Sequence, residues 1–162
     1  MLAALNTPGI TKIVARKSRD HTEILFKYLK IPIKIKKTKK LSFIEIERKN
    51  NIKSLNYNIP SDISSSAFFI VLTLLSKKSS LTVKNVNINP SRTGFIIILN
   101  KMGAKIIFRN KREYKGEKIA DIYVKSAKSL KAIKCPTKYN SSSIDEFLII
   151  FLVAAKSKGI SF

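Results

Sequence analysis

Two short polar segments carry the residue types that could do acid–base or anion-binding chemistry. Asp145 stands in Ser141–Glu146, directly before a long apolar stretch, in the first turn of a predicted buried helix. A carboxylate there either caps the helix or acts as a general base at the rim of a cleft. Arg19 stands in Ser18–Glu23, which opens another predicted helix. An Arg beside the N–H groups of a helix start can hold an anion, and the alternative is an ordinary solvated cap.

Metal, thiol and phosphate-loop chemistry have little support in the sequence. His21 is the single His, and no Cys or carboxylate cluster with ligand spacing surrounds it, so we expect a helix-start role and no metal. Cys135 is the single Cys, which excludes a disulfide framework and fits a reducing compartment. It has no visible base partner, so a nucleophilic role has little support. Gly94 is a lone glycine rather than part of a phosphate-binding loop.

The charge of the chain allows two interpretations. Among its 162 residues the formal net charge is +22, which is typical of proteins that bind nucleic acid or acidic surfaces. The basic residues, however, are 26 Lys and 6 Arg, whereas dedicated nucleic-acid binders rely on Arg for bidentate contacts. A Lys-, Ile- and Asn-rich composition also follows from A/T-rich codons. A Lys-rich binding module using Lys34–Lys40 is therefore the alternative to an enzyme.

Nothing in the sequence predicts a membrane protein. Met1–Leu5 is too short for the core of a signal peptide, and Pro8 follows soon after it. The apolar runs Ala67–Leu75 and Phe147–Ala155 are each about half of the ~20 residues that span a bilayer. We expect both to be buried helices of a cytoplasmic protein.

The chain repeats a helix–turn–strand pattern. Ser66–Val83 and Asp145–Phe162 each contain an apolar helix, a short polar turn and the start of a β-branched strand, and Met1–Ile13 shows the end of the same pattern. A second repeat matches Ile10–Arg19 with Val83–Arg92, and an amphipathic helix follows each. We expect its N-caps at Ser18 and Ser91. The predicted core faces of these two helices are Leu25, Phe26 and Leu29, and Ile98, Leu99 and Met102.

Two strands are predicted after each amphipathic helix. They are Ile31–Lys36 with Ser42–Arg48, and Lys105–Arg109 with Ile119–Lys125. With Ile59-Pro60 as an opening strand, the repeated unit becomes βαβαββ. The first unit lacks its beginning and the third its end, which would leave apolar faces and ladder groups open. We therefore expect a piece of a longer protein, truncated at both ends.

Segments in order along nearly the whole chain together resemble the 3-phosphoshikimate 1-carboxyvinyltransferase (enolpyruvyl-shikimate-phosphate synthase) family, in its glyphosate-insensitive bacterial class. They are Leu2–Thr11 (LAALNTPGIT), Ser18–Glu23 (SRDHTE), Ile59–Leu75 (IPSDISSSAFFIVLTLL), Asn89–Ile106 (NPSRTGFIIILNKMGAKI), Gly116–Ser126 (GEKIADIYVKS) and Ile144–Glu146 (IDE). Each segment alone is a weak signal, but their order on a βαβαββ repeat is a strong one.

The resemblance implies an α/β (α+β) fold of βαβαββ units, of the inside-out α/β barrel type, with an active site between two domains. Residues 1–58 would be the C-terminal part of the first enolpyruvyl transferase domain and residues 59–162 the start of the second. The implied reaction moves the enolpyruvyl group of phosphoenolpyruvate to the 5-hydroxyl of shikimate 3-phosphate and releases phosphate. The family uses no metal or cofactor, and we expect no nucleic-acid or membrane partner and a monomeric full-length enzyme.

The resemblance also assigns site residues. Asp145 matches the carboxylate that accepts the proton of the 5-hydroxyl. Arg19 matches the Arg that contacts the shikimate phosphate, with Ser18 as a second candidate, and the expected site has Arg19 and Asp145 facing each other across one cleft. The segment around Arg92 and Gly94 is interpreted as structural.

The sequence also departs from the family pattern. Leu148 replaces a usual Pro and Ala132 a usual Gly. The family's Lys, Ser and Arg near the N-terminus, its Ser-Ala-Gln segment and its phosphoenolpyruvate-binding Glu, Lys and Arg are not in this sequence. We therefore expect this polypeptide alone to be inactive, and a decayed enzyme remnant stays open as a further alternative.

Overall fold

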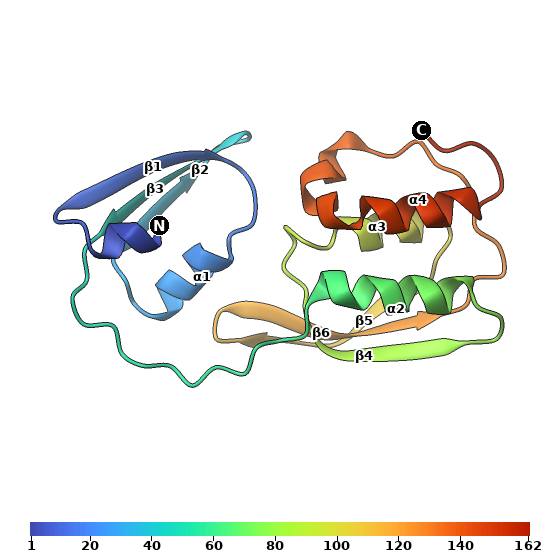
Figure 1. Cartoon of the computed structure of the whole chain (residues 1–162), viewed down its shortest axis with the longest axis horizontal. Coiled ribbons are helices and arrows are strands. Elements are labelled where there is room, and N and C mark those ends of the chain that lie inside the picture. The colour runs from blue at the N-terminus through green and yellow to red at the C-terminus, as the bar shows by residue number, and fades with distance from the viewer. The chain divides into compact units, whose positions relative to one another are not determined.

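The computed structural model describes all residues, Met1–Phe162, and the chain divides into two compact units. The first comprises Met1–Asn58 with Tyr114–Glu117, and the second comprises Ile59–Glu113 with Lys118–Phe162 (Figure 1). The assignment of residues 1–58 and 59–162 to two enolpyruvyl transferase domains stays a prediction.

The first unit contains a three-stranded sheet, one α-helix and a 3-10 turn. Its elements are η1 (Leu2–Leu5), β1 (Ile10–Arg16), α1 (His21–Tyr28), β2 (Ile33–Lys37) and β3 (Leu41–Glu47). The strand order is β1-β3-β2, and both outer strands run antiparallel to β3. The two strands predicted after the first amphipathic helix are therefore confirmed.

Strand register explains the core of the first unit. Ile44 of β3 lies opposite Ile13 of β1 and Ile35 of β2, so apolar side chains share one face of the sheet. Phe26 of α1 is buried against this face, but Leu25 is 37% exposed, so that part of the predicted helix face is wrong. A neighbouring residue on a helix points about 100° away, and Phe26 takes the central position.

The second unit combines a sheet with three α-helices. Its elements are α2 (Ile63–Leu75), β4 (Ser80–Asn87), α3 (Gly94–Lys101), β5 (Ile106–Tyr114), β6 (Glu117–Lys125), η2 (Thr137–Ser142), η3 (Ile144–Glu146) and α4 (Phe147–Ala155). The strand order is β4-β6-β5, so this unit repeats the order of the first sheet. Helix α2 contacts β4, while α4 packs against both α2 and α3 (Figure 1).

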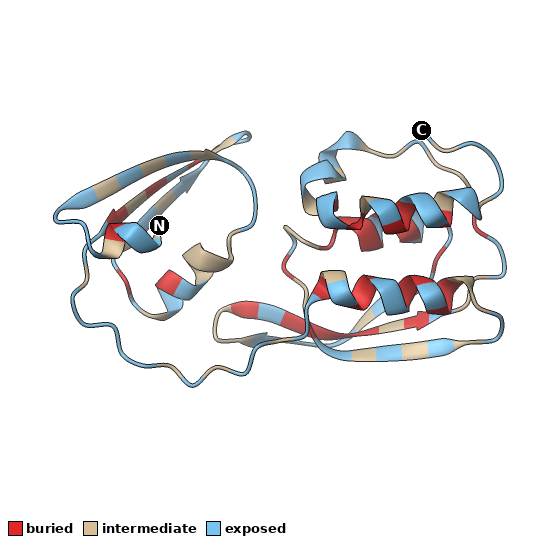
Figure 2. Cartoon of the chain, viewed as in Figure 1, coloured by how far each residue is buried: buried red, intermediate tan, exposed pale blue.

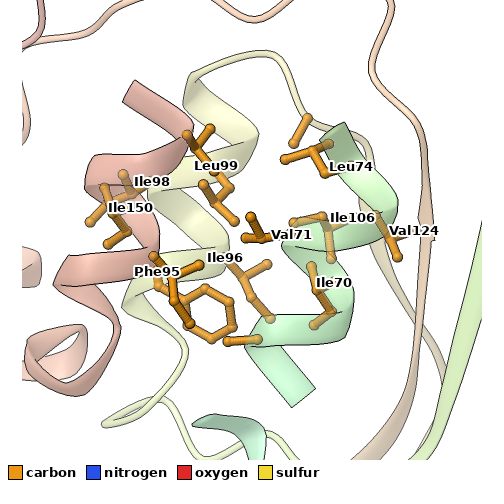
Figure 3. Close-up of a cluster of buried hydrophobic side chains, with 14 of the residues drawn as sticks. Ile70, Val71, Leu74, Phe95, Ile96, Ile98, Leu99, Ile106, Val124 and Ile150 are labelled. Carbon is orange, nitrogen blue, oxygen red and sulfur yellow. The ribbon is translucent and has the colours of Figure 1, made fainter. Parts of the chain in front are cut away.

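One continuous apolar core joins the helices and the sheet of the second unit. Figure 3 shows Val71 of α2, Ile98 of α3 and Ile150 of α4 within this core. The predicted core face of α3 is confirmed, because Ile98, Leu99 and Met102 are at most 1% exposed. Burial follows the inner faces of α2 and α4, whose outer faces expose large apolar side chains (Figure 2). These exposed residues are Phe68, Phe69, Leu72, Leu148, Phe151 and Leu152.

Single parallel bridges stand where the repeat predicts opening strands. Ser61 bridges Val86, with backbone hydrogen bonds from Ser61 to Asn85 and from Asn87 to Ser61 of 2.9 and 3.0 Å. The strand expected at Ile59-Pro60 is reduced to this one residue, since Pro60 has no N–H to donate to a ladder. A second parallel bridge joins Lys131 to Lys158 across α4.

A β-bulge in β4 is fixed by a buried carboxylate. The register between β4 and β6 shifts between Val83 and Val86, and Asn85 adopts a positive φ of 56° there. Asp121 of β6 accepts a hydrogen bond of 2.9 Å from the Asn85 N–H and one of 2.8 Å from the Asn110 amide. The bond from Asn110, together with that from Asn85, lowers the pKa of Asp121.

None of the helices in the structure combines the length and the apolar character that crossing a bilayer requires.

Candidate active site

The side chain of Arg92 connects the segments that begin three helices of the second unit. Its Nη2 donates a hydrogen bond of 2.5 Å to Ser64 Oγ in the first turn of α2. The same nitrogen lies 3.5 Å from Asp62 Oδ1, just before α2, and 3.4 Å from Asp145 Oδ2, just before α4. Arg92 itself stands two residues before the start of α3, and its side chain is only 14% exposed. A mostly buried guanidinium is thus paired with two carboxylates, as buried charge requires.

Asp62 is the N-cap of α2. Its carboxylate accepts hydrogen bonds of 2.7 Å from the Ser65 N–H and 2.9 Å from the Ser65 hydroxyl. Burial alone would raise the pKa of Asp62, but the bonds from Ser65 and the charge of Arg92 outweigh it and lower that pKa. Asp62 therefore stays ionised beside Arg92.

The turn before α3 fixes the backbone of Arg92. The buried Asn89 accepts hydrogen bonds of 2.9 and 2.8 Å from the N–H and hydroxyl of Ser91, and its carbonyl accepts one of 2.8 Å from the Arg92 N–H. The prediction that Ser91 caps this helix is wrong, since Asn89 takes its hydroxyl and α3 begins later, after Thr93. Such a local Asx turn competes with helix formation.

Asp145 lies in a 3-10 turn rather than in the α-helix expected from the sequence. The turn η3 (Ile144–Glu146) precedes α4, and the Asp145 side chain is 40% exposed while Glu146 is 1% exposed. Glu146 accepts a short hydrogen bond from the hydroxyl of Ser64, which also receives the bond from Arg92. Two adjacent carboxylates thus have different surroundings: Glu146 belongs to the core, while Asp145 is accessible to a ligand.

Gly94 allows this turn to lie against the start of α3. A Cβ at Gly94 would collide with the hydroxyl oxygens of Ser142 and Ser143, and would lie 3.0 Å from the backbone carbon of Ser142. Ser143 is fully buried, and its Oγ has no hydrogen-bond partner. The absence of a side chain at Gly94 therefore sets how closely the Asp145 turn approaches Arg92.

The other predicted site residues, Ser18 and Arg19, belong to the first unit. Both are exposed in the connection between β1 and α1. The predicted N-cap at Ser18 is wrong, because α1 begins at His21 and the residue before it is Asp20. Asp20 makes no side-chain cap bond and instead accepts a hydrogen bond of 2.8 Å from Lys37 Nζ. The roles of Ser18 and Arg19 stay predictions.

His21 stands at the first position of α1, as expected, and its Nδ1 lies 2.5 Å from Oε1 of Glu117. No group of three or more His, Cys, Asp or Glu residues is arranged to hold a metal ion.

Arg92 is the residue that sequence reasoning placed outside the site. A signal for it is present in the sequence, because Arg92 is the only Arg between Arg48 and Arg109 and stands close to a helix start. What spacing alone could not supply was its partners, since Arg92 and Ser64 are 28 positions apart.

Comparison with known proteins identifies the class to which this repeated fold belongs. The family profile described as EPSP synthase (3-phosphoshikimate 1-carboxyvinyltransferase) matches residues 1–162. The chain therefore belongs to the EPSP synthase family, and the resemblance and fold class expected from the sequence are confirmed.

Individual relatives agree with this assignment. The 3-phosphoshikimate 1-carboxyvinyltransferase of Legionella pneumophila (strain Corby) is 40% identical over 160 residues, which are 98% of this chain and 36% of that protein. That of Zymomonas mobilis is 39% identical over 162 residues, with 99% and 36% covered. A solved EPSP synthase from Acinetobacter baumannii superimposes with a TM-score of 0.85 at 36% identity, over 98% of this chain and 35% of that one. The chain thus spans about a third of the length of these relatives.

Proposed function

We propose that this chain contributes residues to an enzyme that transfers the enolpyruvyl group of phosphoenolpyruvate to the 5-hydroxyl of shikimate 3-phosphate. The observation that carries the proposal is the family match over all 162 residues, together with an accessible carboxylate, Asp145, held beside Arg92. A cytoplasmic location and a monomeric state of the whole enzyme are part of the same proposal.

The proposed reaction is an addition followed by an elimination. The 5-hydroxyl oxygen forms a bond to C2 of phosphoenolpyruvate, while the methylene carbon takes up a proton. In the resulting tetrahedral intermediate the bond from C2 to the phosphate oxygen then breaks, and the methyl carbon returns its proton. No group changes oxidation state, and the products are 5-enolpyruvylshikimate 3-phosphate and phosphate.

Asp145 is the proposed general base for the addition. An ionised carboxylate can accept the proton of the 5-hydroxyl as its oxygen attacks C2. The 40% exposure of the side chain supports this role, because a substrate hydroxyl needs direct access to the carboxylate oxygen. The buried neighbour Glu146 lacks such access.

Arg19 is the proposed ligand of the phosphate on the shikimate ring, and Ser18 is a second candidate for the same group. A guanidinium is always charged and presents paired N–H donors that match phosphate oxygens. Exposure of both residues on the connection before α1 supports the proposal, since an exposed loop can meet a dissolved anion.

A graft tests the proposed reaction. The 162-residue chain replaces the matched region of the Legionella pneumophila relative, and phosphate release is measured with both substrates. We expect steady release that requires both substrates and that falls by roughly 100-fold or more with Asp145→Asn, as loss of a general base predicts. Glu113→Gln, which removes another exposed carboxylate, is the matched control and should release phosphate at the unmodified rate. Unchanged release by Asp145→Asn, or no release from a folded graft, would contradict the proposal.

A further inference from the structure

We propose that Arg92 is a positioning residue that holds the carboxylate of Asp145 in one orientation. The meaning of this role for catalysis rests on the proposed function, but the orientation itself can be measured without substrate. Arg92 contacts Asp145 through Nη2, at 3.4 Å from Oδ2. Arg92 does not cover Asp145 fully, because the side chain of Asp145 is 40% exposed.

Arg92 can orient Asp145 only if Arg92 is itself fixed, and the structure fixes it at both ends. At the backbone, the Asn89 carbonyl accepts the Arg92 N–H at 2.8 Å. At the guanidinium, the Ser64 hydroxyl accepts a hydrogen bond at 2.5 Å. Ser64 in turn donates to the buried Glu146, so its hydroxyl has one defined direction. A chain of hydrogen bonds thus runs from the core to the guanidinium.

Electrostatics favour the same arrangement. The carboxylates of Asp62 and Asp145 lie within 3.5 Å of one nitrogen of Arg92, so their like charges are close to each other. The guanidinium between them offsets that repulsion. Asp62 is in addition tied to Ser65, whereas the side chain of Asp145 is 40% exposed.

A lysine cannot reproduce this geometry. The ammonium of Lys supplies the charge of Arg92, but it is a rotatable point charge without the planar group that sets the direction of Nη2, the nitrogen that contacts the hydroxyl and both carboxylates. We therefore expect Arg92→Lys to hold Asp145 partially, and Arg92→Met, which keeps the length and loses the charge, to release it.

The test measures the side-chain rotamer of Asp145 in the isotopically labelled 162-residue chain. Three-bond couplings from Cγ of Asp145 to its backbone nitrogen and carbonyl carbon report whether χ1 occupies one staggered well or an average of several. We expect one rotamer in the unmodified chain, averaged couplings in Arg92→Met and intermediate values in Arg92→Lys. Arg109→Met is the matched control, because Arg109 stacks on Tyr123 away from Asp145, and it should leave the couplings unchanged.

Ser64→Ala provides a second route to the same answer. It removes the closest partner of the guanidinium and leaves both charges in place, so averaging of the Asp145 couplings is again expected. Should Arg92→Met fail to fold, the decision rests on Ser64→Ala and Arg92→Lys. A single rotamer of Asp145 in the folded variants would overturn the proposal.

A kinetic measurement in the graft separates this proposal from the proposed function. We expect Arg92→Met to lower kcat by roughly 10- to 100-fold with a smaller change in KM, as misplacement of a reacting group does. The variant should cause no additional loss in the Asp145→Asn background, because it acts through Asp145. Normal turnover in Arg92→Met would overturn the positioning role, whereas absence of turnover in the unmodified graft would contradict the proposed function and leave the rotamer test standing.

Discussion

Adjacent residues in the turn before α4 have opposite surroundings. Asp145 is 40% exposed and Glu146 is 1% exposed, although both are carboxylates in one 3-10 turn. A turn of three residues points successive side chains about 120° apart, so one can enter the core while the next meets solvent. The buried Glu146 side chain is tolerated in the core because it accepts a hydrogen bond from the Ser64 hydroxyl.

Gly94 has no side chain at the point where the start of α3 lies against Ser142 and Ser143. We expect Gly94→Ala to lower the free energy of unfolding by about 1–3 kcal/mol, the usual cost of overpacking a core. The added methyl group would press on Ser142 and Ser143 in the turn before Asp145. Urea denaturation of the 162-residue chain measures the effect.

Gly9→Ala is the control for this substitution. Nothing lies within 4 Å of a Cβ at Gly9, whose φ is +81°, so its cost should be the roughly 1–2 kcal/mol of a left-handed backbone alone. The two losses therefore have different causes, and adding Ser142→Gly should recover part of the loss at Gly94 and none at Gly9. A Gly94→Ala variant as stable as the unmodified chain would show that the turn can move away from α3.

At the scale of elements, the sequence predicted the helices and strands better than their first residues. The long apolar helices and the paired strands follow from periodicity, which is a local property of the chain. The predicted caps at Ser18 and Ser91 are wrong, because α1 and α3 begin three residues later, at His21 and Gly94. The Ser91 hydroxyl donates a hydrogen bond to Asn89, and the carboxylate of Asp20 accepts one from Lys37.

The start of α2 should make folding sensitive to acid. In the folded chain the pKa of Asp62 is lower than its usual value, so its stabilising effect is complete above the unfolded pKa of about 4 and is lost as the pH falls through the folded pKa. We expect Asp62→Ala to lower the free energy of unfolding by about 1 kcal/mol near pH 7, the usual worth of an N-cap. The difference from the unmodified chain should shrink below about pH 4.

Asp62→Asn separates the cap from the charge. The amide oxygen still accepts the Ser65 N–H, while the attraction to Arg92 is lost, so the loss at pH 7 should be smaller than in Asp62→Ala. This loss should also shrink below about pH 4, because the unmodified chain loses the charge of Asp62 there. Urea denaturation at pH 7 and pH 3 provides the comparison. If Asp62→Ala lowered the free energy of unfolding by the same amount at both pH values, a charge-dependent role of Asp62 would be contradicted.

At the scale of the whole molecule, the chain has two separate apolar cores. The first centres on Phe26, Ile44 and Ile46, and the second on the inner faces of α2, α3 and α4. Compact units with their own cores can open independently. The Lys residues that carry most of the positive charge occur in the sequence of both units.

A core substitution should therefore act on one unit. Ile98→Ala removes buried methyl groups from the second core and should cost about 2–5 kcal/mol. We expect amide hydrogen exchange to accelerate in α2, α3 and β6, while β1 and β3 keep their rates. Phe26→Ala should give the reverse pattern, and equal acceleration in both units after either substitution would show a single cooperative structure.

The sequence by itself determined the elements, the repeat and the family, because hydrophobic period, turn residues and short ordered segments are all local in the chain. It also singled out Asp145 as a carboxylate beside a helix start. Only the tertiary structure decided what surrounds that carboxylate. Asp62, Ser64, Arg92 and Asp145 come from three separate segments, with Ser64 and Glu146 82 positions apart. These segments meet because α2, α3 and α4 bury their apolar faces in one core, and that packing is a property of no single segment.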